Sequence, residues 1–198
     1  MIKKILEIDR DLFLFLNGMG SETFDGFWLL ITKQASWIPV FIIIAFLLFK
    51  HLGWRHALLI FIAVSLLLTV TDQSTNLVKA YFQRIRPVNN PEFANLMRIV
   101  QIRNSFGFFS GHAANSMAVA VFMFCVLRRH LKYMGFIFIW PVIFAYSRIY
   151  LGLHYPLDIF CGYLWGTLMG VLMFELYRFA RNHFFPVEKE NLDHPANT

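Results

Sequence analysis

Residues 56–80 read HALLIFIAVSLLLTVTDQSTNLVKA, and this stretch decides the fold. From Ala57 to Val70 it carries no charge, and only Ser65 and Thr69 interrupt its apolar side chains. A helix needs roughly 20 mostly apolar residues to cross the hydrocarbon core of a bilayer. The stretch is close to that length, so we predict a transmembrane helix here.

Three further stretches are also mostly apolar and near bilayer length, at residues 110–127, 133–150 and 157–179. Of the 198 residues, 58% are hydrophobic and only 15% are charged, which is too apolar for an ordinary soluble domain. Five or six spans use up nearly the whole chain. We therefore predict an all-α, polytopic membrane helix bundle of five to six spans, with one domain over residues 1–185 and a polar, disordered tail over 186–198.

The N-terminal part is less regular. The first twenty residues predict a short helix at the membrane interface that ends at Gly18 and Gly20. Residues 24–49 are apolar except around 32–36, with Pro39 shortly after, so they form either one long broken span or two short ones. We favour two, because neither half reaches full length alone. Two spans would place the N-terminus on the cytoplasmic side.

The net charge of +6 does not indicate a nucleic-acid partner, because the positive residues punctuate the apolar runs instead of forming one basic face. Under the positive-inside rule, residues 50–56, 128–132 and 178–183 are predicted to be cytoplasmic. The polar loop 83–109 and the turn 148–158 then share the opposite face. Cys125 and Cys161 lie inside apolar stretches, and we interpret both as packing residues.

Two clusters of unusual polar residues fall on that opposite face. Lys79 and Arg86 end one span, and seven residues are about two helical turns, so both cations could face one point if the helix persists. Ser110, Gly111 and His112 begin the next span, where backbone N–H groups and the helix dipole favour an anion. Both clusters therefore indicate binding of a negatively charged group.

A third cluster adds a charge and a base to the same face. Arg148 follows Ser147, and His154 and Asp158 follow at the start of the next span. Pro156 breaks the helix between them, so Asp158 is expected to cap the next helix while its carboxylate reaches back to His154. A histidine held by a carboxylate can attack phosphorus, and a second histidine can protonate the leaving oxygen and then activate water. This assigns His154 as the nucleophile and His112 as acid and base.

These motifs resemble the type 2 phosphatidic acid phosphatase family, which shares its site with vanadium haloperoxidases and bacterial acid phosphatases. The family pattern of Lys, six residues and Arg-Pro matches Lys79 to Arg86-Pro87. Its Pro-Ser-Gly-His motif matches residues 109–112, with Phe109 in place of the proline. Its third motif, Ser-Arg, five residues, His, three residues, Asp, matches residues 147–158.

The resemblance implies a haloperoxidase-like phosphatase core and hydrolysis of a lipid phosphate or diphosphate through a phosphohistidine, without metal or other cofactor. Candidate substrates are undecaprenyl diphosphate, phosphatidylglycerol phosphate, phosphatidic acid and lipid A. It implies that His154 is the nucleophile, His112 the general acid and Asp158 the residue that orients His154. The phosphate-binding residues it implies are Lys79, Arg86, Ser110, Gly111 and Arg148.

Two alternatives compete with this interpretation. His154 and Asp158 could be metal ligands, but three converging cations repel a divalent metal and attract a phosphate. A transporter of anionic lipid or phosphate would use the cations without hydrolysis, but it has no need of an oriented nucleophile.

The remaining expectations concern the surroundings of the site. Arg84, Arg98 and Arg103 are either solvated loop charges or secondary contacts to an anionic headgroup. The compact chain suggests a bacterial inner membrane protein with its site on the periplasmic face. The expected partners are the bilayer and a lipid phosphate; the sequence identifies no protein partner.

Overall fold

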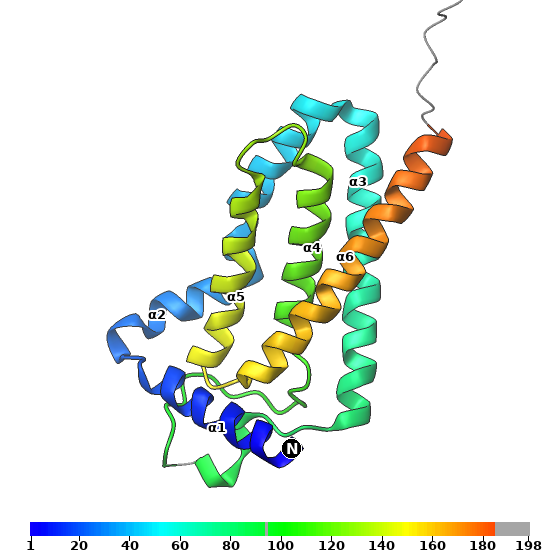
Figure 1. Cartoon of the computed structure of the whole chain (residues 1–198). Helices are drawn as coiled ribbons and strands as arrows, with labels where there is room; N and C mark the ends of the chain where they lie inside the picture. Colours follow the sequence, from blue (N-terminus) through cyan, green and yellow to red (C-terminus); the bar gives the residue numbers. More distant parts are fainter. Residues whose placement is uncertain (94, 185–198) are drawn as a thin grey trace, which may run out of the picture.

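The computed structural model describes residues 1–93 and 95–184, and every regular element within them is helical. The predicted all-α architecture is thus confirmed, whereas the tail expected over 186–198 lies outside the described residues. Figure 1 shows the six α-helices. They are α1 (Ile2–Gly18), α2 (Glu22–Ile31), α3 (Ile38–Phe82), α4 (Gly111–Leu127), α5 (Ile139–Tyr150) and α6 (Pro156–Phe184). Four short 3-10 helices join them: η1 (Gln34–Trp37), η2 (Pro87–Asn89), η3 (Pro91–Phe93) and η4 (Met134–Phe138).

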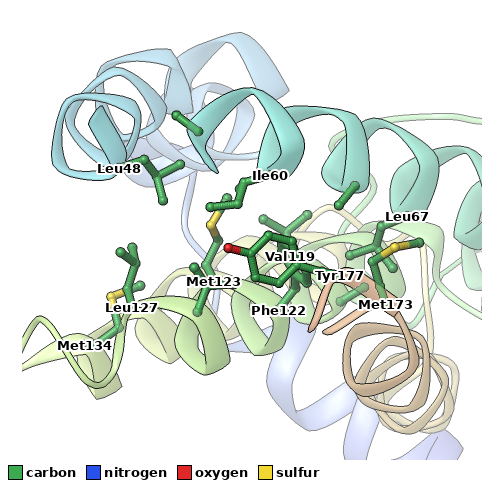
Figure 2. Close-up of a cluster of buried hydrophobic side chains, with 14 residues drawn as sticks. Leu48, Ile60, Leu67, Val119, Phe122, Met123, Leu127, Met134, Met173 and Tyr177 are labelled. Carbon is green, nitrogen blue, oxygen red and sulfur yellow. The ribbon is translucent and has the colours of Figure 1, made fainter. Parts of the chain in front are cut away.

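The core of the bundle lies between α3, α4 and α6. Leu48 and Ile60 of α3, Phe122 of α4 and Tyr177 of α6 belong to one buried hydrophobic cluster (Figure 2). Phe122 is completely buried, and its ring meets that of Tyr177 edge to face at 5.8 Å. This cluster packs the helices together at a distance from the predicted polar face. The helix ends at that face are thereby held in place to carry the site.

Glycine at every fourth position brings α6 into close contact with α4. These glycines, Gly162, Gly166 and Gly170, share one helix face. A Cβ on Gly162 would lie 2.7 Å from the carbonyl oxygen of Ser110, and a Cβ on Gly166 would overlap the carbonyl oxygen of Ala114. The absence of side chains lets the two backbones approach, so the first turns of α4 and α6 lie side by side.

Replacing Gly166 with alanine is expected to lower the free energy of unfolding by about 1–3 kcal/mol, because the methyl group meets rigid backbone and the helices must separate. Gly26→Ala is the matched control: it is an exposed helical glycine with no neighbouring atom within 4 Å of an added Cβ. Thermal unfolding in detergent measures both. Equal melting temperatures for the two variants would contradict the close packing of α4 and α6.

A single residue divides α3 into two arms. Gly53 has φ 75° and ψ 168°, a conformation that glycine adopts without steric cost. The chain reverses direction there (Figure 1). The two arms pack together, with the rings of Phe49 and Phe61 6.0 Å apart. The loop expected at residues 50–56 is therefore reduced to a break at Gly53. The predicted span 133–150 also differs, since it begins with the 3-10 helix η4 before α5 starts at Ile139.

The N-terminal helix α1 lies across the end of the bundle where α4 and α6 begin (Figure 1). Its Asn17 donates hydrogen bonds to the carbonyl oxygens of Ile149 and Tyr150 at the end of α5, and accepts one from the N–H of Arg98. The helix predicted for the first twenty residues, with its end at Gly18, is confirmed. Our preference for two spans in residues 24–49 was wrong, because it would have placed α1 at the other end of the bundle.

Among the described residues, two helical segments are long and apolar enough to cross a membrane, Gln34–Phe93 and Pro156–Phe184. Two shorter apolar segments, Gly111–Leu127 and Met134–Tyr150, stand between them. These four segments cover, to within one residue, the four stretches that the sequence marks as spans.

Candidate active site

The structure brings the three predicted clusters together at one end of the bundle. Lys79 lies in the last turn of α3, His112 in the first turn of α4, and Arg148 in the last turn of α5. His154 occupies the connection to α6, and Asp158 lies in the first turn of that helix. Segments far apart in sequence therefore meet at one site.

His154 and Asp158 form a buried pair. Nδ1 of His154 lies 3.4 Å from Oδ2 of Asp158, and the same oxygen accepts a hydrogen bond from the backbone N–H of Tyr155 at 3.0 Å. Helix α6 begins at Pro156, so Asp158 binds the backbone from within the first turn instead of preceding it as expected. If Nδ1 carries the proton toward Asp158, Nε2 carries the lone pair that can attack phosphorus.

Arg86 holds the opposite edge of the His154 ring. Helix α3 ends at Phe82, and Gln83 has φ 48°, so Arg86 reaches the site from irregular chain and not from a continued helix. Its Nη1 lies 2.9 Å from Nε2 of His154, and its Nε donates to the carbonyl oxygen of Ser105 at 2.7 Å. Burial, with the nearby charge of Arg103, lowers the pKa of the Arg86 guanidinium to about 10. It remains charged at neutral pH.

The other two cations are without carboxylate partners. Arg148 is 2% exposed, its Nη1 donates to Oγ1 of Thr32, and its Nε has no hydrogen-bond partner among the described residues. The ammonium group of Lys79 forms no hydrogen bond or ion pair with the described residues, and its Nζ lies 3.5 Å from where a Cβ on Gly111 would be. Arg148 is buried and Lys79 is partly buried, and such cations are costly without a partner unless a ligand pairs with them.

The start of α4 completes the site. Oγ of Ser110 accepts a hydrogen bond from the N–H of Ala113, and the N–H of Ser110 donates to the carbonyl oxygen of Asp158 at 3.0 Å. The N–H groups of Gly111 and His112 have no partner within the helix, as in any first turn. The imidazole of His112 stacks on Phe144 at 4.9 Å and lies close enough to Arg148, His154 and Lys79 to interact electrostatically.

The His154 imidazole is neutral in this environment. Burial is the main cause that holds its pKa well below the usual value, and the positive charges of Arg86, Arg148 and Lys79 act in the same direction. A neutral imidazole has the lone pair that nucleophilic attack on phosphorus requires. Bringing in a phosphate would neutralise the surrounding cations.

The structure also shows site residues that sequence reasoning missed or left open. Thr32 and Ser105 hold Arg148 and Arg86, and neither carries a motif signal. Arg84 contacts Asp158, and Arg103 is exposed but interacts electrostatically with His112, Lys79, Arg86 and Arg148. Arg98 instead pairs with Asp25 of α2 at 3.0 Å.

The structure also describes the remaining motif residues and the two cysteines. Phe109, which replaces the family proline, is 6% exposed and packs against Trp165. Oγ of Ser147 donates to the carbonyl oxygen of Phe144 at 2.6 Å and so stays within its own helix. Cys125 and Cys161 are partly buried and unpaired. In residues 1–93 and 95–184, no group of three or more His, Cys, Asp or Glu side chains is arranged to hold a metal ion.

Comparison with known proteins assigns this geometry to a family. The model of the PAP2 superfamily matches residues 54–182, which hold every predicted site residue. The chain belongs to the PAP2 superfamily. It is 38% identical over 179 residues to the lipid A 4'-phosphatase of Bacteroides thetaiotaomicron, covering 88% of this chain and 79% of that protein. It is 35% identical over 185 residues to the lipid A 4'-phosphatase of Porphyromonas gingivalis, covering 91% and 77%.

Solved structures agree on the fold of this PAP2 superfamily member. A transmembrane PAP2-type phosphatidylglycerolphosphate phosphatase from Bacillus subtilis superposes with a TM-score of 0.64, over 91% of this chain and 87% of that one, at 21% identity. The predicted family is thereby confirmed, and so is the prediction of a membrane hydrolase that acts on lipid phosphates. The transporter alternative is set aside, because the relatives are phosphatases.

Proposed function

We propose that this protein removes the 4'-phosphate of lipid A through a phosphohistidine on His154. One observation carries the chemistry: Arg148 is buried with an unpartnered Nε, next to a neutral His154 whose Nε2 faces Arg86. A phosphate supplies the missing negative charge and accepts bidentate hydrogen bonds from guanidinium groups. Its phosphorus can then approach Nε2.

The first step forms one bond and breaks another. Nε2 of His154 attacks phosphorus, the bond from phosphorus to the lipid oxygen breaks, and His112, protonated once the bound phosphate offsets the cations around it, gives a proton to that oxygen. Asp158 accepts a hydrogen bond from Nδ1 and stabilises the positive charge that the imidazole gains. Lys79, Arg86 and Arg148 stabilise the negative charge on the transferring phosphoryl group.

The second step releases phosphate. His112, now neutral, takes a proton from water, and the water oxygen attacks the phosphohistidine. The bond from phosphorus to Nε2 breaks, and the His154–Asp158 pair returns to its starting state. Ser110 and Gly111 contribute the start of α4, where N–H groups and the helix dipole favour the anion.

An apolar cavity beside the site supports a lipid substrate. It measures about 300 Å³ and is lined by both arms of α3, by α4 and by α5, including Phe41, Leu48, Phe61 and Trp140. Phe144 joins the two regions, because it lines the cavity and stacks on His112. A lipid whose phosphate is bound by the cations can therefore place an acyl chain in this apolar cavity.

The orientation of the chain follows from charge. We propose five membrane crossings, made by the two arms of α3 and by α4, α5 and α6, because the 10 residues of α2 span only about 15 Å. Arg128, Arg129, Arg178 and Arg181 line a small cavity at the end opposite to the site. The positive-inside rule makes that end cytoplasmic and the active site periplasmic in a bacterial inner membrane. Residues 1–185 form one domain in this proposal.

Phosphate release from purified lipid phosphates tests the substrate. With lipid A bisphosphate, undecaprenyl diphosphate, phosphatidylglycerol phosphate and phosphatidic acid at equal concentrations in detergent, we expect kcat/KM to be at least about 10-fold higher for lipid A. Mass spectrometric fragmentation of the product should show loss of the 4'-phosphate with the 1-phosphate retained. A preference for another lipid, or loss of the 1-phosphate, would contradict this choice of substrate.

A further inference from the structure

Helix α1 contacts the active site through one buried carboxylate. Asp9 is 5% exposed, although the neighbouring charged residues of α1 are partly or fully exposed. Its Oδ1 accepts a hydrogen bond from the backbone N–H of Leu157 at 2.7 Å, and its Oδ2 accepts one from Nη2 of Arg84 at 2.6 Å. Asp9 is thus bonded both to the first turn of α6 and to a cation from the loop after α3.

Arg84 bridges Asp9 to the catalytic carboxylate. Its Nη1 donates to Oδ1 of Asp158 at 2.6 Å, so the two arms of one guanidinium hold two carboxylates. The plane of that guanidinium is further fixed by the ring of Tyr155, whose centroid lies 4.1 Å from Cζ. With Oδ1 engaged by Arg84, the other oxygen of Asp158 is directed to the N–H of Tyr155 and to Nδ1 of His154.

We propose that Asp9 and Arg84 are positioning residues for the hydrolysis, acting together through Asp158 on the orientation of His154. This inference rests on the proposed function of His154. The superfamily model begins at residue 54, so Asp9 lies outside the part of the chain that it matches. Helix α1 therefore contributes a positioning residue to the active site, in addition to lying at the membrane surface.

The charges of the three residues suit the reaction. Two carboxylates around one guanidinium leave one net negative charge, and it lies against the imidazole. The imidazole becomes positive when Nε2 bonds to phosphorus, so this charge stabilises the intermediate more than the free enzyme. Substrate binding depends on other groups, namely Lys79, Arg86 and Arg148.

The separation of turnover from binding gives the test. We expect Asp9→Asn and Arg84→Gln to lower kcat about 10- to 100-fold, because a loosened His154 spends less time aligned with phosphorus. KM should change by less than about twofold, since the phosphate-binding cations stay in place. The kcat of the double variant should be no lower than that of the less active single variant, because the two residues act through one chain of contacts.

Asp9→Asn is the gentler substitution, because its amide oxygen can still accept the hydrogen bond from Leu157. Arg10→Gln is the matched control: Arg10 is the next residue of α1, but it pairs with the exposed Glu92 at 3.1 Å. It should retain wild-type kcat and KM. All variants are compared as folded protein, by size-exclusion profile and melting temperature in detergent.

The outcomes separate the two proposals. If the wild-type protein releases no phosphate from any lipid in the panel, the proposed function fails and this inference fails with it. If the wild-type protein is active and Asp9→Asn behaves like Arg10→Gln, the inference alone is overturned. It is also overturned if activity falls only in proportion to the loss of folded protein, or through KM alone.

Discussion

Replacing His154 with alanine is expected to abolish phosphate release from every lipid that the wild-type protein hydrolyses. Without Nε2 no covalent bond to phosphorus can form, and water has to attack directly from the side that His154 occupied, whereas His112 stands on the side of the leaving oxygen and cannot activate it there. We expect kcat to fall at least about 10³-fold, equivalent to roughly 4 kcal/mol of transition-state stabilisation. Release of inorganic phosphate under saturating lipid measures this loss.

The matched control for this variant is His130→Ala. His130 is exposed at the opposite end of the bundle, where its ring lies 6.1 Å from that of His51. Its replacement should leave kcat unchanged. Because His154 is buried, the folding of His154→Ala must be verified by its melting temperature. Turnover within a few-fold of wild type in a folded His154→Ala protein would refute the nucleophile.

Arg148→Gln is expected to have the second largest effect. Glutamine keeps a polar side chain with N–H donors, but it is shorter and loses the buried positive charge that has no carboxylate partner among the described residues. Loss of one preorganised charge at a transition state costs roughly 10²- to 10³-fold in kcat. Binding of inorganic phosphate, measured by competitive inhibition, should weaken in parallel, because Arg148 also contacts the phosphate group that is bound before the reaction.

Stability should change in the opposite direction. Removing an uncompensated buried charge relieves repulsion between Arg148 and its cationic neighbours Arg86 and Arg103, so the melting temperature without phosphate should rise or stay constant. Arg129→Gln, an exposed arginine at the other end of the bundle, is the control for the loss of one charge. Unchanged inhibition by phosphate in Arg148→Gln would show that Arg148 does not bind the anion.

Composition predicts only a membrane protein, whereas the spacing of the motifs predicts which residues form the site. Lys79, His112 and Arg148 come from three helices, yet their positions at span ends already implied a common face, and the structure places them together. Hydrophobic length likewise located the apolar helices that carry them. These features follow from local sequence, because a bilayer fixes how long a helix must be.

The parts that could not be predicted depend on tertiary contacts. Asp9 and Arg84 look like ordinary surface charges in sequence, and only the folding of α1 against α6 brings them to Asp158. The break of α3 depends on one glycine, Gly53, whose positive φ has no distinctive sequence pattern around it. Thr32 lies in the stretch whose interpretation was open, so its contact with Arg148 could not be foreseen.

Rapid chemical quench with lipid A labelled at the 4'-phosphate tests the central claim most directly. A histidine bonded to phosphorus through nitrogen loses its phosphate in acid and keeps it in base, unlike a serine ester. We predict that label appears on the protein within the first turnover, survives base, is lost in acid and maps to the peptide containing His154. Phosphate release with no labelled protein at any time, or label on a different residue, would contradict the account.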